Sequence, residues 1–432
     1  MTKASEYSGG IANLAAGEFR LKAAVRRLGV NFGWLLSSQI LIRLIGFGFG
    51  TFLVRYFGPR DYGQYVFVLA YVTYFGYLAD AGLGRFLIRE VARDQPGLGD
   101  YLPGIVGLRI VLAFAAYLAL LAIALLIQTP ASRTVWIGIA GLSLFSGAFS
   151  GAFTSVFDGR QEMRITSLYT VIATAANAIL ILAALALGFG LAGAFAAHAL
   201  SNLPALGFLW IAFRRRGGWP APTADLRFWR RALQQSLPYA LLGVIGLIFF
   251  RTDTLMLTWL KGANATGIFV AADRLVEALA ILPGIGVAAA FPLLSRLHSG
   301  PRPPLRRAYF GALGFLAAAA LPASIATWAL AGFLIHLLYG SGAYADSVLI
   351  LRILSIAVFL LFLDTANTML LYSGEDLRLV VILSVVTMAT NIGLNLVLIP
   401  RYSYTGAAVS TVVSEAISLA IFTPTVLRYL YA

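Results

Sequence analysis

Apolar runs long enough to cross a bilayer recur along the chain, from Val30 almost to the C-terminus, and they limit what it can fold into. A hydrocarbon core about 30 Å thick requires roughly 20 mainly apolar residues per helix. Hydrophobic residues make up 60% of the 432 residues and charged residues only 12%, so no soluble fold could bury this much apolar surface. We therefore predict an all-α, polytopic membrane protein.

Twelve spans are predicted, in two sets of six separated by the longest polar connector. The first set comprises 30–54, 65–86, 104–127, 135–156, 165–187 and 191–213. The second comprises 236–260, 265–291, 308–333, 346–371, 379–399 and 406–430. Their ends are placed to within roughly 2 to 4 residues. The predicted domains are an N-terminal segment 1–29, an N-terminal six-helix lobe 30–213, a linker 214–235 and a C-terminal six-helix lobe 236–432.

The distribution of basic residues predicts which side of the membrane each connection faces. If the N-terminus is cytoplasmic, 22 Lys and Arg residues fall in cytoplasmic segments and five on the opposite side. Cytoplasmic loops of membrane proteins carry an excess of basic residues, so we place both termini in the cytoplasm. This asymmetry also accounts for the net charge of +14 without nucleic-acid binding. Residues 1–29 combine apolar residues at helical spacing with basic ones and predict an amphipathic helix on the cytoplasmic leaflet.

The two sets of six spans both begin in the cytoplasm, which predicts a pseudo-two-fold axis along the membrane normal. Gly58 and Gly63 lie 204 residues before Gly262 and Gly267, a weak repetition that agrees with this arrangement. Parallel repeats of this kind are typical of transporters that work by alternating access, with a central site between two lobes.

The composition excludes several kinds of chemistry. The chain has no cysteine, which rules out disulfides, thiolate metal sites and thiol catalysis. Its histidines are scattered, at His198, His298 and His336, so no metal site is predicted. The sequence contains no acid–base–nucleophile constellation and no loop long enough for a catalytic domain. We therefore predict neither an enzyme nor a cofactor.

Three arginines lie inside predicted spans at similar depth. An ionisable side chain at the bilayer centre costs roughly 2.5 to 3.5 kcal/mol on insertion scales, so it usually has a partner or a wet cavity. Arg43, Arg251 and Arg274 lie about 16, 14 and 14 Å below the outer face at 1.5 Å per residue. We predict that these three arginines face a central cavity and bind substrate there.

Four carboxylates within the spans are candidates for ion or proton coupling, or for ion pairs with these arginines. They are Asp253, Asp273, Glu277 and Asp364; Asp273 and Glu277 share one helix face. The sequence does not assign roles to Asp80, Glu415 or Arg352, and it leaves the role of Asp364 open.

Two further features receive structural interpretations. Arg109 is five residues from the cytoplasmic end of its predicted span, and we expect its side chain to extend to the membrane surface. Gly46 and Gly50 are four residues apart on one helix face, a pattern that lets a neighbouring helix approach closely.

Several motifs resemble those of polysaccharide flippases in the MOP exporter superfamily. The stretch Arg55-Tyr-Phe-Gly-Pro-Arg-Asp-Tyr-Gly-Gln-Tyr65, followed by Leu78-Ala-Asp-Ala-Gly-Leu83, is similar to their first hairpin. Further similar motifs are Arg251-Thr-Asp253, Gly267-Ile-Phe-Val-Ala-Ala-Asp-Arg274 and Asn391-Ile-Gly-Leu-Asn-Leu-Val-Leu-Ile-Pro400. The resemblance covers nearly the whole chain and is to the Wzx-type O-antigen and exopolysaccharide translocases.

This resemblance implies a specific substrate and location. The expected substrate is undecaprenyl diphosphate carrying an oligosaccharide repeat unit, moved from the inner to the outer leaflet of a bacterial inner membrane for surface polysaccharide biosynthesis. Membrane lipids and other membrane proteins of polysaccharide assembly are the expected partners, with no role for nucleic acid. The resemblance implies that the first, second, seventh and eighth helices line the cavity and that basic residues there face the diphosphate; Arg43, Arg251 and Arg274 match this by helix and depth.

Two alternatives remain open from the sequence. A drug or cation antiporter of the same fold would need an ion-binding carboxylate in a cavity without net positive charge. A membrane-embedded glycan polymerase or ligase would need a large outward loop, and the longest outward connection here, 55–64, has about ten residues.

Overall fold

A computed structural model describes the secondary structure of residues 3–93, 98–215, 221–298, 300–340, 342–373 and 377–431. Side chains are described from residue 33 onward, except at 94–100, 216–220, 242, 245–251, 281, 285, 288–289, 292, 299, 341, 374–378 and 432. The side chains of residues 1–29, for which an amphipathic surface helix is predicted, lie outside the described residues.

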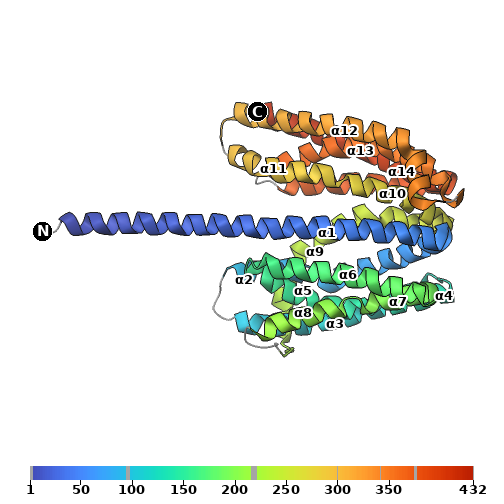
Figure 1. Ribbon diagram of the computed structural model, residues 1–432, viewed down its shortest axis with the longest axis horizontal. Helices are drawn as coiled ribbons and strands as arrows, with labels where there is room; N and C mark the ends of the chain where they lie inside the picture. The colour runs from blue at the N-terminus through green and yellow to red at the C-terminus, as the bar shows by residue number, and fades with distance from the viewer. Residues whose placement is uncertain are drawn as a thin grey trace.

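Every regular element in the described residues is helical (Figure 1). The helices are α1 (Lys3–Asp80), α2 (Leu83–Ala92), α3 (Leu98–Leu126), α4 (Ala131–Gly141), α5 (Ser143–Gly159), α6 (Met163–Ala186), α7 (Gly190–Leu200), α8 (Leu203–Arg214), α9 (Leu226–Lys261), α10 (Ala263–Leu279), α11 (Ile281–His298), α12 (Arg302–Tyr339), the 3-10 turn η1 (Gly342–Tyr344), α13 (Asp346–Tyr372) and α14 (Leu377–Tyr431).

The helices confirm the twelve-span prediction. In the described residues, eight helical stretches are long and apolar enough to cross a membrane. Two of these, Gly33–Asp80 and Leu379–Tyr431, are each divided into two spans by a non-helical residue, Gly58 and Ser403. The remaining two spans are α9 and the pair α10 and α11, each long enough to cross a membrane. The second predicted span runs too far, because α1 ends at Asp80.

The helices form two bundles (Figure 1). We call α1–α8 the N-lobe and α9–α14 the C-lobe; the first helix of each, α1 and α9, lies between the two bundles. In the C-lobe, α13 packs against both α12 and α14. The first half of α9 docks on the N-lobe, where the indole of Trp229 donates to the carbonyl of Gly104 at 2.9 Å. Its second half packs against α14, where Asp253 contacts Asn395, so α9 bridges the two bundles.

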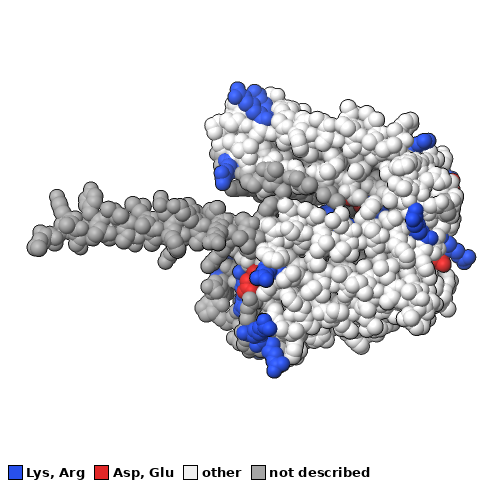
Figure 2. Space-filling view, in the orientation of Figure 1, with Lys and Arg blue, Asp and Glu red and all other residues white. Residues whose placement is uncertain are grey.

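The molecule has two ends, which we name by the predicted orientation. The outer end carries the turns at Gly58, Gly262 and Ser403, and the inner end carries α2 and the start of α9. Figure 2 shows Lys and Arg side chains near the two ends of the molecule, while the flanks of both lobes between them are almost free of charge on this face. Such an apolar belt is what a membrane requires of the surface that it contacts.

The predicted internal repeat appears in the backbone at the outer end. Gly58 ends the first span of α1 with φ 69° and ψ 175°, and Gly262 ends α9 with φ 85° and ψ 171°. Residues other than glycine rarely adopt this combination of φ and ψ. Equivalent turns 204 residues apart therefore join the first two spans of each lobe, as a pseudo-two-fold axis requires.

Candidate functional site

A cavity of about 650 Å³ lies between the lobes, mainly against the N-lobe. It follows the second span of α1 from Tyr62 to Asp80, a length of about 27 Å at 1.5 Å per residue. The other N-lobe walls come from α3, α5 and α7, and the C-lobe contributes residues of α10, including Arg274 and Glu277. Cavities of this size are typical of small-molecule sites.

The outer end of this cavity is closed by a reciprocal contact between the two lobes. A Cβ atom on Gly63 would lie 1.8 Å from the carbonyl oxygen of Ala263, and one on Gly267 would lie 1.8 Å from the carbonyl oxygen of Pro59. Only glycine permits backbones to approach this closely. The two repeat-related helix starts therefore lock together directly at the outer end.

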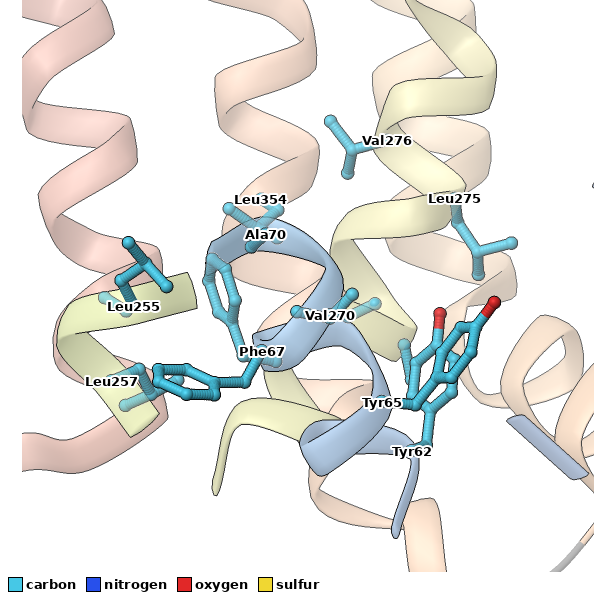
Figure 3. Packing of buried hydrophobic residues seen from close by; sticks show 14 of the residues in the cluster. Tyr62, Tyr65, Phe67, Ala70, Leu255, Leu257, Val270, Leu275, Val276 and Leu354 are labelled. Carbon is cyan, nitrogen blue, oxygen red and sulfur yellow. The ribbon is translucent and has the colours of Figure 1, made fainter. Parts of the chain in front are cut away.

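Hydrogen bonds and ring packing reinforce this closure. Arg55 of α1 donates to the carbonyl of Leu337 on α12 at 2.6 Å, and the hydroxyl of Tyr344 donates to the carbonyl of Val54 at 2.9 Å. Below them, Tyr62 and Tyr65 lie side by side next to Val270 and Leu275 of α10 (Figure 3). Polar and apolar contacts between the lobes thus cover the outer end of the cavity.

The inner half of α1 has few neighbours. Among residues 33–48 the only buried one is Ser38, and the side chains of Leu36, Ile40 and Leu44 are 42%, 50% and 66% exposed. A helix exposed on most of its surface at the inner end, and packed against both lobes at the outer end, indicates that the lobes part toward the inner side. The described conformation is therefore closed outward.

Arg274 reaches across the cavity from the C-lobe to α1. Its guanidinium donates to the carbonyl of Gly46 and, at 3.3 Å, to the hydroxyl of Tyr62. A Cβ atom on Gly50 would lie 1.7 Å from Nη2 of Arg274. The predicted close approach of a helix is not made at these two glycines: the Arg274 side chain fills the space at Gly50, and a Cβ atom on Gly46 would meet nothing within 4 Å.

The other two predicted arginines are placed differently. Arg43 is three residues before Gly46, so it lies about 4.5 Å from that residue along the axis of α1. Its side chain is exposed and does not line the cavity. The side chain of Arg251 is outside the described residues. The structure therefore brings Arg274 to the cavity and places Arg43 at a similar depth on the facing helix.

The four predicted carboxylates separate into two groups. Glu277 lines the cavity one turn from Arg274, and Asp273 is half-buried on the same helix. Asp253 instead lies within the C-lobe, where it accepts hydrogen bonds from the amide of Asn395 and, at 3.2 Å, from the hydroxyl of Thr411.

The fourth carboxylate, Asp364, is 8% exposed and also lies within the C-lobe, away from the cavity lining. It accepts a hydrogen bond from the hydroxyl of Ser418 at 2.9 Å. In the described part of the chain, no group of three or more His, Asp or Glu side chains is arranged to hold a metal ion.

An ion pair that the sequence did not predict lies at the inner part of the cavity. Arg109 of α3 is only 2% exposed and pairs with Asp80, the last residue of α1. The expectation that Arg109 extends to the membrane surface is therefore wrong, because a carboxylate from another span neutralises it in the interior. Both residues lie near the same end of consecutive predicted spans, and this shared depth is the signal that could have paired them.

Comparison with known proteins places the chain in a family. The family model of the polysaccharide biosynthesis protein matches residues 28–298, and that of the lipid II flippase MurJ matches residues 263–430. No curated protein matches the chain.

Solved structures share the fold. The lipid II flippase MurJ in its inward closed conformation is 13% identical, with 91% of this chain and 88% of the other covered and a TM-score of 0.74. A multidrug resistance MATE family transporter of the MOP superfamily gives a TM-score of 0.71 in its inward-facing conformation, at 16% identity over 90% of this chain and 95% of the other. The outward-facing conformation of such a transporter gives 0.60, at 17% identity over 93% and 94%.

The two-lobe fold is the one that transporters and flippases of the MOP superfamily share. Because a single family model matches well over half of its length, this multi-pass membrane chain belongs to the polysaccharide biosynthesis protein family.

Proposed function

We propose that this protein is a flippase that moves a polyprenyl-diphosphate-linked oligosaccharide from the inner to the outer leaflet of a bacterial cytoplasmic membrane by alternating access. The family membership and the match to the lipid II flippase model support a lipid-linked substrate. Undecaprenyl diphosphate with a sugar repeat unit is the proposed substrate, and both termini are proposed to be cytoplasmic.

The observation that carries this proposal is the Arg274 guanidinium in a cavity that is closed at its outer end. A guanidinium has five N–H donors arranged for bidentate contact with phosphate oxygens. Arg274 uses donors on Nη1 and Nη2 for Tyr62 and Gly46, while its Nε is buried without a hydrogen-bond partner in the described residues. Donors on this side chain thus remain for an anion.

Arg43 and Arg251 are proposed to complete the diphosphate site. Arg43 is one helical turn from the carbonyl that Arg274 contacts, and Arg251 lies on α9, next to the cavity helices in the fold. An anion held midway through the membrane without such groups would face a large desolvation cost. The family membership and the match to the lipid II flippase model favour the flippase over an antiporter of the same fold.

The test is a leaflet-exposure assay in proteoliposomes with a lipid-linked oligosaccharide. We expect Arg274→Ala to abolish flipping with normal folded yield, and Arg274→Lys to retain part of it, because lysine keeps the charge and loses the bidentate geometry. Arg352→Ala is the matched control: this exposed arginine lies over the ring of Trp328 at 5.4 Å, outside the cavity lining. Wild-type flipping by Arg43→Ala, Arg251→Ala and Arg274→Ala alike would refute the proposed site.

A further inference from the structure

The pair of Asp80 and Arg109 gives the cavity a second polar end. Asp80 lies at the inner end of the cavity. Tyr62, which contacts Arg274, lies about 27 Å away along α1 toward the outer end. The side chain of Asp80 is 40% exposed, whereas that of Arg109 is 2% exposed. A molecule in the cavity therefore meets the carboxylate of Asp80 with the guanidinium behind it.

Several residues are arranged around the buried guanidinium. A Cβ atom on Gly151 would lie 2.1 Å from Nη1 of Arg109, and one on Gly84 would lie 3.1 Å from Nη2. Besides Asp80, Arg109 has one weak contact, to the carbonyl of Ala148 at 3.5 Å, and its Nε is buried without a partner in the described residues. The interior of the N-lobe thus makes room for an arginine whose ion-pair partner is a cavity residue.

Stability alone is a poor explanation for this arrangement. A buried ion pair can often be replaced by apolar residues of similar volume with no loss of stability. A carboxylate offers about four lone-pair positions, and the contact with Arg109 uses one of them. The oxygens of Asp80 that face the cavity are therefore free to accept hydrogen bonds from a ligand.

The charge at this end selects the chemistry of that ligand. The carboxylate of Asp80 accepts hydrogen bonds from hydroxyl groups, whereas the guanidinium of Arg274, near the opposite end, donates hydrogen bonds to phosphate oxygens. The cavity wall near Asp80 also carries the ring of Tyr77, about one turn away on α1, and Ser143 at the start of α5. Polar groups interleaved with an aromatic ring suit a carbohydrate, which has hydroxyls on its edge and C–H groups on its faces.

We propose that Asp80 is a binding residue for the sugar hydroxyls of the transported oligosaccharide and that Arg109 is its positioning residue. This inference rests on the proposed function and divides the substrate between two ends of one cavity. Arg274 binds the diphosphate, which all polyprenyl-diphosphate-linked oligosaccharides share. Asp80 contacts the sugars, which differ between polysaccharides, so it contributes specificity.

The decisive variant removes the pair as a unit. The double variant Asp80→Leu with Arg109→Met removes the buried charge together with its partner. Apolar residues of similar volume then fill the space, so we expect the protein to fold. Two probes are compared for binding to purified protein in nanodiscs: the lipid-linked oligosaccharide extracted from the source cells, and undecaprenyl diphosphate without sugar. We expect the sugar-bearing lipid to bind about 10- to 100-fold more weakly, because a hydrogen bond to a charged group is lost. Binding of the bare lipid should be unchanged.

Controls separate this result from general effects of charge. Arg89→Gln with Glu90→Gln removes another guanidinium–carboxylate pair, at 2.9 Å, that does not line the cavity, and should leave both affinities unchanged. Should the double variant fold poorly, Asp80→Glu keeps the ion pair and moves the carboxylate by one methylene group. We expect it to weaken binding of the sugar-bearing lipid about tenfold and to spare the bare lipid.

The outcomes also separate this inference from the proposed function. Wild-type affinity of the double variant for the sugar-bearing lipid, or an equal loss for both lipids, would overturn the role of Asp80 and leave the flippase assignment intact. If wild-type protein neither binds nor flips either lipid, the proposed function itself fails, and the sugar site falls with it.

Discussion

Replacing Gly63 by alanine should open the outer end of the protein. The added Cβ would lie 1.8 Å from the carbonyl oxygen of Ala263, and real Cβ atoms essentially never approach closer than 3.0 Å. The two helix starts would therefore have to part by at least the difference, 1.2 Å. The neighbour is backbone, so it cannot rotate away. Gly267→Ala makes the reciprocal clash with Pro59 and should have the same effect.

The size of the effect follows from overpacking energies. Forcing an extra methyl group into a tight contact typically costs about 1 to 3 kcal/mol. The cost falls only on the closed state, because the contact is absent once the lobes separate at this end. The ratio of outward-closed to outward-open molecules should therefore fall by about 5- to 150-fold.

The absence of cysteine in the sequence makes a direct measurement possible. Spin labels at Gln128→Cys and Ala343→Cys, exposed positions at the outer end of the N-lobe and the C-lobe, report the distance between the lobes by double electron–electron resonance. Gly63→Ala should add a longer-distance population. Gly48→Ala, whose Cβ would have no neighbour within 4 Å, should not. Identical distance distributions in wild type and Gly63→Ala would refute the glycine lock.

Three further outcomes are expected. Topology reporters fused in the 214–235 connector and at Ala432 should both register as cytoplasmic, and an outward signal at either would reverse the orientation. Collapsing an inside-negative potential at constant pH and sodium should slow flipping, since moving about two negative charges outward gains roughly 2.3 kcal/mol per charge per 100 mV; an unchanged rate would exclude voltage as a driving force. Gly50→Ala should displace the Arg274 guanidinium and reduce flipping about as much as Arg274→Lys does, with unchanged folded yield; wild-type flipping would show that the Gly50 space is dispensable.

The fold was largely predictable because the bilayer imposes a simple length rule on apolar helices. That rule placed the twelve spans, and the repeated glycine spacing placed equivalent turns at Gly58 and Gly262. The errors occur where helices are interrupted by local backbone conformation. The second span was predicted to reach residue 86, but Gly82 adopts φ 74° and starts the separate helix α2 at Leu83. Hydropathy does not detect such a break, because α2 buries Leu83, Phe86 and Leu87 as a span would.

The site was less predictable because its contacts depend on which helices face each other. Depth along a helix can be computed from residue number, and it identified Arg274 as a cavity residue. Direction around the helix cannot be obtained that way for a chain that is apolar on most faces. Arg109 was therefore interpreted as a surface-seeking arginine, although its partner Asp80 was present at the same depth in the preceding span.

The pair of Gly46 and Gly50 shows why a motif alone does not settle its use. Two glycines four residues apart create a shallow groove on a membrane helix, and either a helix backbone or a long side chain can fill it. Here the guanidinium of Arg274, from the other lobe, fills the space at Gly50 and donates to the carbonyl of Gly46. A backbone contact offers no group to a ligand, whereas a guanidinium held by a backbone carbonyl can exchange that carbonyl for a phosphate oxygen. The groove is therefore better understood as a resting place for a ligand-binding group than as a packing surface.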